Sequence, residues 1–94
     1  ISATVNNGVM NIKLSGRIDS ISVPDFLTVF EKANAENEVD TVEVDCKELS
    51  YISSAGLRVL LMISKLHDVH LINVNDTVKD ILSQTGFDQI VKVK

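Results

Sequence analysis

The sequence contains few cysteine, glycine, proline and aromatic residues. Its one cysteine, Cys46, cannot form an internal disulfide, and a single thiol with two scattered histidines gives no metal-binding pattern. Only four glycines and one proline occur in 94 residues that are 45% hydrophobic, which indicates a globular chain rather than a disordered one. The length suits one domain over residues 1–94, and the unpaired cysteine favours a reducing, cytoplasmic setting.

The sequence also lacks an excess of positive charge and a long apolar run. The chain has nine Lys and Arg residues and thirteen Asp and Glu residues. It has no basic cluster of the kind found in nucleic-acid-binding proteins. The longest apolar run, residues 59–63, is far shorter than the roughly 18 residues that cross a membrane, and no stretch has the pattern of a signal peptide. We therefore expect neither a nucleic-acid partner nor direct insertion into a membrane.

Strand and helix patterns alternate along the first half of the chain. Asn7-Gly8 predicts a tight hairpin turn, because both central positions of such a turn need a positive φ. Apolar and polar residues then alternate over residues 10–15, as in a half-buried strand. Residues 16–22 are expected to form a loop, followed by a helix with Pro24 in its first turn and a polar break over residues 34–40.

The second half of the chain continues this alternation. Val42, Val44 and Cys46 share one face of a strand pattern, which predicts a buried strand. The later segments predict a helix over residues 54–66, a strand over 69–74, a helix in 76–87 with Asp76 as cap and Gly86 as its C-terminal stop, and a short strand over 90–94. Strands that alternate with helices predict the α/β class, with a largely parallel sheet covered by helices.

The stretch LSYISSAGLRVLL (residues 49–61) holds the candidate functional residues. Ser53 and Ser54 lie where the helix is expected to begin, and serine is a preferred N-cap residue. A phosphorylated Ser54 is the alternative, because a helix N-terminus offers free N–H groups and the positive end of the helix dipole to a phosphate. Gly56 has no side chain that could cover the neighbouring surface, so we expect the Ser54 hydroxyl to be accessible. The two interpretations are compatible, and both stay open at this point.

One face of this helix combines basic and large apolar residues. At about 100° per residue, Ser54, Arg58 and Lys65 fall on one stripe. The same geometry directs Val59, Leu60, Ile63 and Leu66 to the sheet, and it leaves Leu57, Leu61 and Met62 beside the polar stripe, where complete burial is difficult. The stripe is typical of a docking face, although neighbouring helices could also cover its leucines.

Three segments of the chain, taken in order, resemble one known family. They are GRIDS (residues 16–20), VEVDCKELSYISSAGLRVLL (42–61) and HLINVNDTVKDILSQTGF (70–87). Together they resemble a STAS domain of the bacterial anti-sigma-factor antagonist type over nearly the whole chain. The resemblance implies an α/β fold in a single domain, with a mixed, mostly parallel sheet of four to five strands and three to four helices.

The resemblance also implies a function as a binding module and not an enzyme, with no cofactor and no metal. Proteins of this type bind an anti-sigma factor that has serine-kinase activity, and this binding releases a sigma factor. The kinase phosphorylates a serine that matches Ser54, with Ser53 as second choice, and a serine phosphatase removes the phosphate. The chain is then expected to be a monomer or weak dimer whose partner-binding residues are Asp19, Ser20, Ser53, Ser54, Gly56, Arg58, Leu61, Met62 and Lys65.

The sequence departs from the commonest pattern of that family beside the serine. Ser53 stands where many members have aspartate, and Ala55 replaces a frequent serine or threonine. The change removes one negative charge and places a second hydroxyl next to Ser54. Asp19 matches the family aspartate in the neighbouring loop.

Three other functions compete with this one. In a receiver domain, Asp45 would be the residue that is phosphorylated. Such a domain needs an acidic pair near its first strand to bind Mg²⁺, and no acidic residue precedes Asp19. A serine hydrolase needs a Gly-x-Ser-x-Gly motif and a positioned histidine, whereas His67 and His70 lie beyond the far end of the helix. A STAS-type subunit of a lipid-transport, anion-transport or stress-signalling complex remains the alternative, with the serine acting only as a cap.

Overall fold

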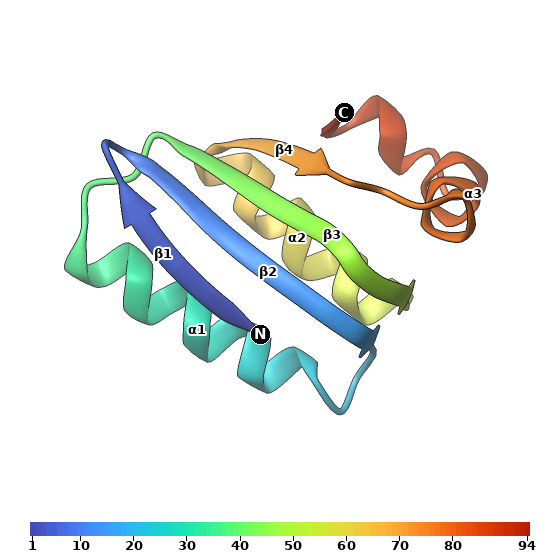
Figure 1. The fold of residues 1–94 in the computed structure, drawn as a ribbon, viewed down its shortest axis with the longest axis horizontal. Helices are drawn as coiled ribbons and strands as arrows, with labels where there is room; N and C mark the ends of the chain where they lie inside the picture. The colour runs from blue at the N-terminus through green and yellow to red at the C-terminus, as the bar shows by residue number, and fades with distance from the viewer.

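Five strands form one sheet in the order in which they follow along the chain, and three α-helices connect the last four strands (Figure 1). The computed structural model describes residues 1–94. Its elements are β1 (Ser2–Asn6), β2 (Val9–Ile18), α1 (Val23–Glu36), β3 (Thr41–Ile52), α2 (Ser54–Leu66), β4 (Asp68–Ile72), α3 (Asp76–Gln84), a short 3₁₀ helix η1 (Phe87–Gln89) and β5 (Lys92–Val93).

The sheet is mixed, with one antiparallel pair and three parallel pairs. β1 and β2 form the predicted hairpin, and Asn7 and Gly8 have the positive φ values of 52° and 80° that its turn requires. β2–β3, β3–β4 and β4–β5 are parallel, which requires the helical crossovers α1, α2 and α3. The predicted α/β class and mostly parallel sheet are therefore confirmed.

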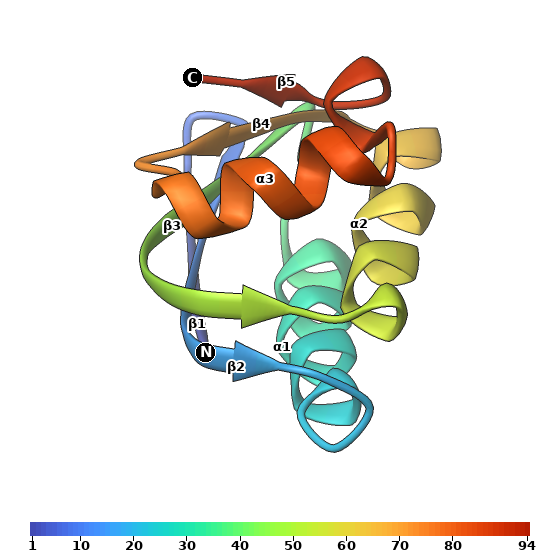
Figure 2. The ribbon, with the colours of Figure 1, turned by 90° about the vertical axis from the view of Figure 1, so that its right-hand side faces the viewer.

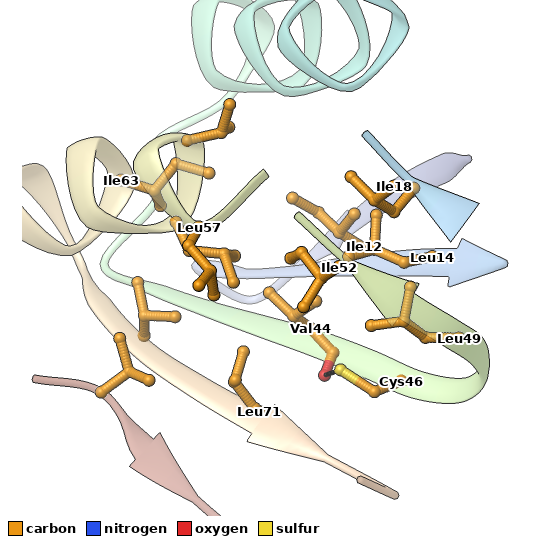
Figure 3. Close-up of a cluster of buried hydrophobic side chains, with 14 of the residues drawn as sticks. Ile12, Leu14, Ile18, Val44, Cys46, Leu49, Ile52, Leu57, Ile63 and Leu71 are labelled. Atoms are coloured by element: carbon orange, nitrogen blue, oxygen red, sulfur yellow. Dashed lines mark hydrogen bonds between the residues drawn. The ribbon is translucent and has the colours of Figure 1, made fainter. Parts of the chain in front are cut away.

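The hydrophobic core lies on the face of the sheet that α1 and α2 cover (Figure 2). One row of paired residues across all five strands points to this side: Ala3, Ile12, Val44, Leu71 and Val93. Figure 3 shows Val44 and Leu71 below Leu57 of α2. Val42, Val44 and Cys46 are each at most 1% exposed, which confirms the predicted buried strand.

The opposite face of the sheet is polar. The adjacent row of paired residues there is Thr4, Asn11, Glu43, His70 and Lys92. No buried residue of the protein is polar or charged. One apolar and one solvated face is the common arrangement for sheets that contain antiparallel strands. None of the helices is long and apolar enough to cross a membrane.

Two predicted boundaries in the first half of the chain are wrong. β2 continues through residues 16–18, which we expected in a loop, because β3 also extends and Arg17 and Ile18 pair with Tyr51 and Ile52. The Arg17 guanidinium lies 4.3 Å from the centre of the Tyr51 ring, which further joins the two strand ends. Helix α1 includes residues 34–36 of the expected polar break, because Ala33 packs against the core and the Asn34 side chain is hydrogen-bonded to His67.

Two boundaries in the second half also differ. β4 ends at Ile72, and Asn73 then takes a positive φ of 56°. The cap of α3 is Asn75 and not Asp76, because the Asn75 side chain accepts a hydrogen bond from the Val78 N–H (2.9 Å) and donates one to the Leu49 carbonyl (2.6 Å). Gly86 has φ 73° just beyond the helix, as its predicted role as a stop requires.

Candidate functional site

Ser53 is the residue that joins β3 to α2. Its backbone is extended (φ −84°, ψ 173°), and its hydroxyl accepts a hydrogen bond from the Gly56 N–H at 3.4 Å. The Ser53 N–H donates to the carbonyl of Ile18 at 2.8 Å, so the start of α2 is fixed to the end of β2. Ser53 is therefore the N-cap of α2, which confirms the prediction that this serine pair caps the helix.

Ser54 is the first residue of α2 and lies on the surface. Its hydroxyl forms no hydrogen bond within the chain, in contrast to the half-buried Ser53 beside it. The first N–H groups of a helix have no partner inside the helix, and the dipole is positive at this end. The two serines thus have different roles: one caps the helix, and the other presents a free hydroxyl.

Gly56 is buried, which contradicts its expected place on the partner-binding surface. A Cβ atom at this position would lie 2.7 Å from Cγ1 of Ile52 and 2.9 Å from Cγ2 of Ile18. The absence of a side chain therefore lets the first turn of α2 rest on the ends of β2 and β3. Gly56 supports the position of Ser54 from below instead of opening space around it.

Replacing Gly56 by alanine is expected to destabilise the protein by about 1–3 kcal/mol, because both close contacts are with branched, buried side chains. The change should lower the Tm by several degrees in a thermal melt followed by circular dichroism. Ser54→Ala, two residues away on the surface of the same helix, is the control and should leave the Tm nearly unchanged. A higher Tm for Gly56→Ala, as helix propensity alone would give, would show that the contacts relax freely.

The loop between β2 and α1 lies beside this helix start, because Asp19 follows the Ile18 carbonyl that binds Ser53. Asp19 Oδ1 accepts hydrogen bonds from the N–H groups of Ile21 (3.1 Å) and Ser22 (3.3 Å). The bond from Ile21, aided by those from Ser22, holds the pKa of the Asp19 carboxyl below its usual value. Asp19 thus orders the loop, and Ser20 is exposed at its tip.

Ile21 is a surface residue that the sequence analysis missed. It is 86% exposed, more than any other large hydrophobic residue of the chain. It lies between Ser20 and Ser22 in a polar stretch, where no strand or helix pattern accounts for an apolar side chain. That mismatch was the available signal, and the structure shows Ile21 exposed in the turn that the Asp19 side chain orders.

The exposed side of α2 agrees only in part with the predicted stripe. Arg58, Met62 and Lys65 are exposed, as Ser54 is, and Met62 is 39% accessible. Leu61 is half-buried and packs against the core. These residues form one surface with Ser54 along the helix.

Two leucines of α2 were placed on the wrong side. Leu57 is only 6% exposed, although we expected it to be hard to bury, because the first turn of α2 lies directly on the strand ends (Figure 3). Leu66 was expected to face the sheet but is 65% exposed. It is the last residue of α2, after which the chain leaves for β4, so no further turn continues the buried stripe.

The other reactive side chains are elsewhere in the fold. Asp45 accepts hydrogen bonds from the Asn73 side chain and the Lys47 N–H, both at 3.0 Å, and these bonds lower the pKa of its carboxyl. The two histidines bind other residues: His67, after the far end of α2, binds Asn34, and His70 binds Asp68 on β4. No three His, Cys, Asp or Glu side chains lie close enough together to hold a metal ion.

Comparison with known proteins identifies similar sequences and folds. The model of the STAS domain family matches residues 1–94. Comparison with curated protein sequences gives no significant match.

The solved structures that are similar to this fold include the following three. An anti-sigma factor antagonist from Mycobacterium paratuberculosis has a TM-score of 0.82 at 17% identity, over 97% of this chain and 80% of that chain. The unphosphorylated form of the anti-sigma factor antagonist SpoIIAA has a TM-score of 0.80 at 20% identity, over 97% and 84% of the two chains. The phosphorylated form of SpoIIAA, a Bacillus cell fate determinant, has a TM-score of 0.66 at 19% identity, over 97% and 86%. At these identities the similarity establishes a common fold.

Proposed function

The chain belongs to the STAS domain family, and we propose that it is a phosphorylation-switched binding module that antagonises an anti-sigma factor. In its unphosphorylated form it binds an anti-sigma factor that has serine-kinase activity, and this binding releases a sigma factor. Phosphorylation of Ser54 ends the binding, and a serine phosphatase restores it. The exposed hydroxyl of Ser54, without a hydrogen-bond partner at the start of α2, is the observation that carries this proposal.

The surroundings of the two serines favour Ser54 over Ser53 as the phosphorylated residue. The Ser53 hydroxyl is half-buried and accepts the capping hydrogen bond from Gly56, so a phosphate there would have to replace that cap. A phosphate on Ser54 would extend into solvent close to the first N–H groups of α2. The fold can therefore carry the added charge at Ser54 without rearranging the helix start.

The partner-binding surface in this proposal, the Ser54 face, runs from the β2–α1 loop onto α2. The loop contributes a rigid turn, since the Asp19 side chain binds two successive backbone N–H groups. The helix contributes basic charge and an exposed thioether. The members of the face are Asp19, Ser20, Ile21, Ser53, Ser54, Arg58, Leu61, Met62 and Lys65, of which all but Asp19, Ser53 and Leu61 are exposed.

The arrangement supports a binding role and not catalysis. Nucleophilic catalysis by serine needs a general base within hydrogen-bond reach of the hydroxyl. Ser54 has no such neighbour, and both histidines are hydrogen-bonded to other residues. In the proposed reaction the kinase partner supplies the chemistry, and this chain supplies the acceptor hydroxyl.

Met62→Ala is expected to weaken binding to the kinase partner about 5- to 30-fold with little change in Tm, because apolar anchors in the middle of an interface carry much of the binding energy. Leu61→Ala should lower the Tm as well as the affinity, since Leu61 belongs to the Ser54 face and also packs against the core. Titration calorimetry and thermal melts separate the two effects.

Ile90→Ala is the matched control for Met62, because Ile90 is an exposed apolar residue (50%) that follows η1 and is not a member of the Ser54 face. It should bind the partner as the wild type does. Equal losses of affinity for Met62→Ala and Ile90→Ala would place the partner on a different surface.

The function itself is tested by incubating the chain with such a kinase and ATP and following both phosphate incorporation and complex formation. We expect phosphate to be incorporated and the complex to dissociate. A stable complex without any phosphate incorporation would indicate the transport or stress-complex role, in which Ser53 and Ser54 are only structural.

A further inference from the structure

We propose that the free edge of β1 is a self-association surface, on which β1 of a second copy of this chain pairs in antiparallel orientation. The proposal is independent of the Ser54 switch. It starts from a difference between the two edges of the sheet. β5 has only two residues and carries charge at Lys92 and Lys94, which opposes pairing with another strand. β1 has five residues, and none of them is charged, proline or glycine. Natural edge strands are usually short, charged or interrupted, which prevents pairing with another chain.

The hydrogen-bonding groups on this edge are self-complementary. Asn6 and Val9 pair on either side of the two-residue turn, and bonded and non-bonded pairs alternate along an antiparallel ladder. The alternation turns the N–H and C=O groups of Ala3 and Val5 to the free side. A twofold axis through Thr4 would place Ala3 of each copy opposite Val5 of the other, with the two Thr4 side chains as a favourable cross-strand pair.

A groove beside β1 provides room for side-chain contacts in such a dimer. It has a volume of about 280 Å³ and lies between β1 and the second half of α1. Ala3 and Val5 line one side, and Val29 and Ala33 line the other. Figure 1 shows β1 as the outermost strand, with α1 running alongside it. The twofold axis brings the two α1 helices together over this groove, and the small Ala33 permits a close approach.

Charges on α1 favour a second copy of the chain as the occupant. Lys32 and Glu36 both line the groove, are exposed and are one helical turn apart. When the two α1 helices lie antiparallel, Lys32 of each copy lies opposite Glu36 of the other. The twofold dimer therefore has two ion pairs across the seam, which is the contact between the two α1 helices. A partner with one charge sign would meet a like charge at one of these positions. The start of α2 lies away from this edge, so both surfaces can be occupied together (Figure 1).

Sedimentation equilibrium of the wild type and of Lys32→Glu and Glu36→Lys variants tests this assignment. The wild type should shift from monomer to dimer as its concentration rises, and each single variant should dimerise at least ~5-fold more weakly, because each replaces two attractions by two repulsions. Circular dichroism should show that both variants remain folded, since these side chains are exposed.

An equimolar mixture of the two variants is the decisive sample. Each substituted side chain then meets an opposite charge across the seam, so the mixed dimer should form although neither variant dimerises well alone. The proposal is overturned by a wild type that stays monomeric at every concentration, by single variants that dimerise as well as the wild type, or by a mixture that stays monomeric. The first result would leave the edge to a partner other than this chain, such as an extended peptide.

Discussion

Val44→Asp is expected to leave the chain unfolded at 25 °C. Val44 is fully buried in β3, between Ile12 of β2 and Leu71 of β4, and no buried polar group is nearby to pair with a carboxylate. An unpaired buried charge costs several kcal/mol, which is a large part of the 5–15 kcal/mol by which typical domains are stable. Far-UV circular dichroism should show the loss of both helix and strand signals.

Ser50→Asp provides the matched control. It adds the same charge to the same strand, but Ser50 is exposed. Its spectrum and Tm should remain close to those of the wild type. A cooperative thermal transition for Val44→Asp near the wild-type temperature would mean that β3 does not occupy the centre of the core.

Phosphorylation of Ser54 is expected to weaken binding to the kinase partner about 100-fold. A phosphoryl group adds close to two negative charges to the surface that must contact the partner. Desolvating these charges without full pairing costs several kcal/mol, and about 3 kcal/mol already corresponds to a hundredfold loss of affinity. Ser54→Asp carries one of the two charges and should weaken binding in the same direction while its melting curve stays unchanged.

Two variants separate the position of the charge from its presence. Ser54→Ala should bind as the wild type does and resist phosphorylation. Ser83→Asp places the same single charge on an exposed position of α3 and should keep full affinity. Wild-type affinity for Ser54→Asp would remove Ser54 from the interface.

The sequence predicted those features that depend on local patterns. The bounds of α2 at residues 54 and 66 agree with the structure, because a capping serine, a buried strand and an apolar helical stripe all indicate the same boundary. The burial of Val42, Val44 and Cys46 followed from simple alternation, and burial raises the pKa of the Cys46 thiol to about 12. The order of helices and strands required only the alternation of the two periodicities.

The features that were missed depend on contacts between distant segments. Residues 16–18 belong to β2 only because β3 extends to Ile52, which no pattern within the loop shows. The role of Gly56 is set by Ile18 and Ile52, which come from two different strands. The surface placement of Ile21 depends on the turn that Asp19 forms, which no strand or helix pattern in this polar stretch indicates.

The measurement that tests the switch most directly is mass-spectrometric mapping of the phosphate after reaction with the kinase partner and ATP. Wild type, Ser53→Ala and Ser54→Ala are compared at equal reaction times. The free hydroxyl of Ser54 and the capping role of Ser53 predict phosphate on Ser54 in the wild type and in Ser53→Ala, and none in Ser54→Ala. Phosphate on Ser53, or modification of Ser54→Ala at the full rate, would contradict the assignment of Ser54 as the switch.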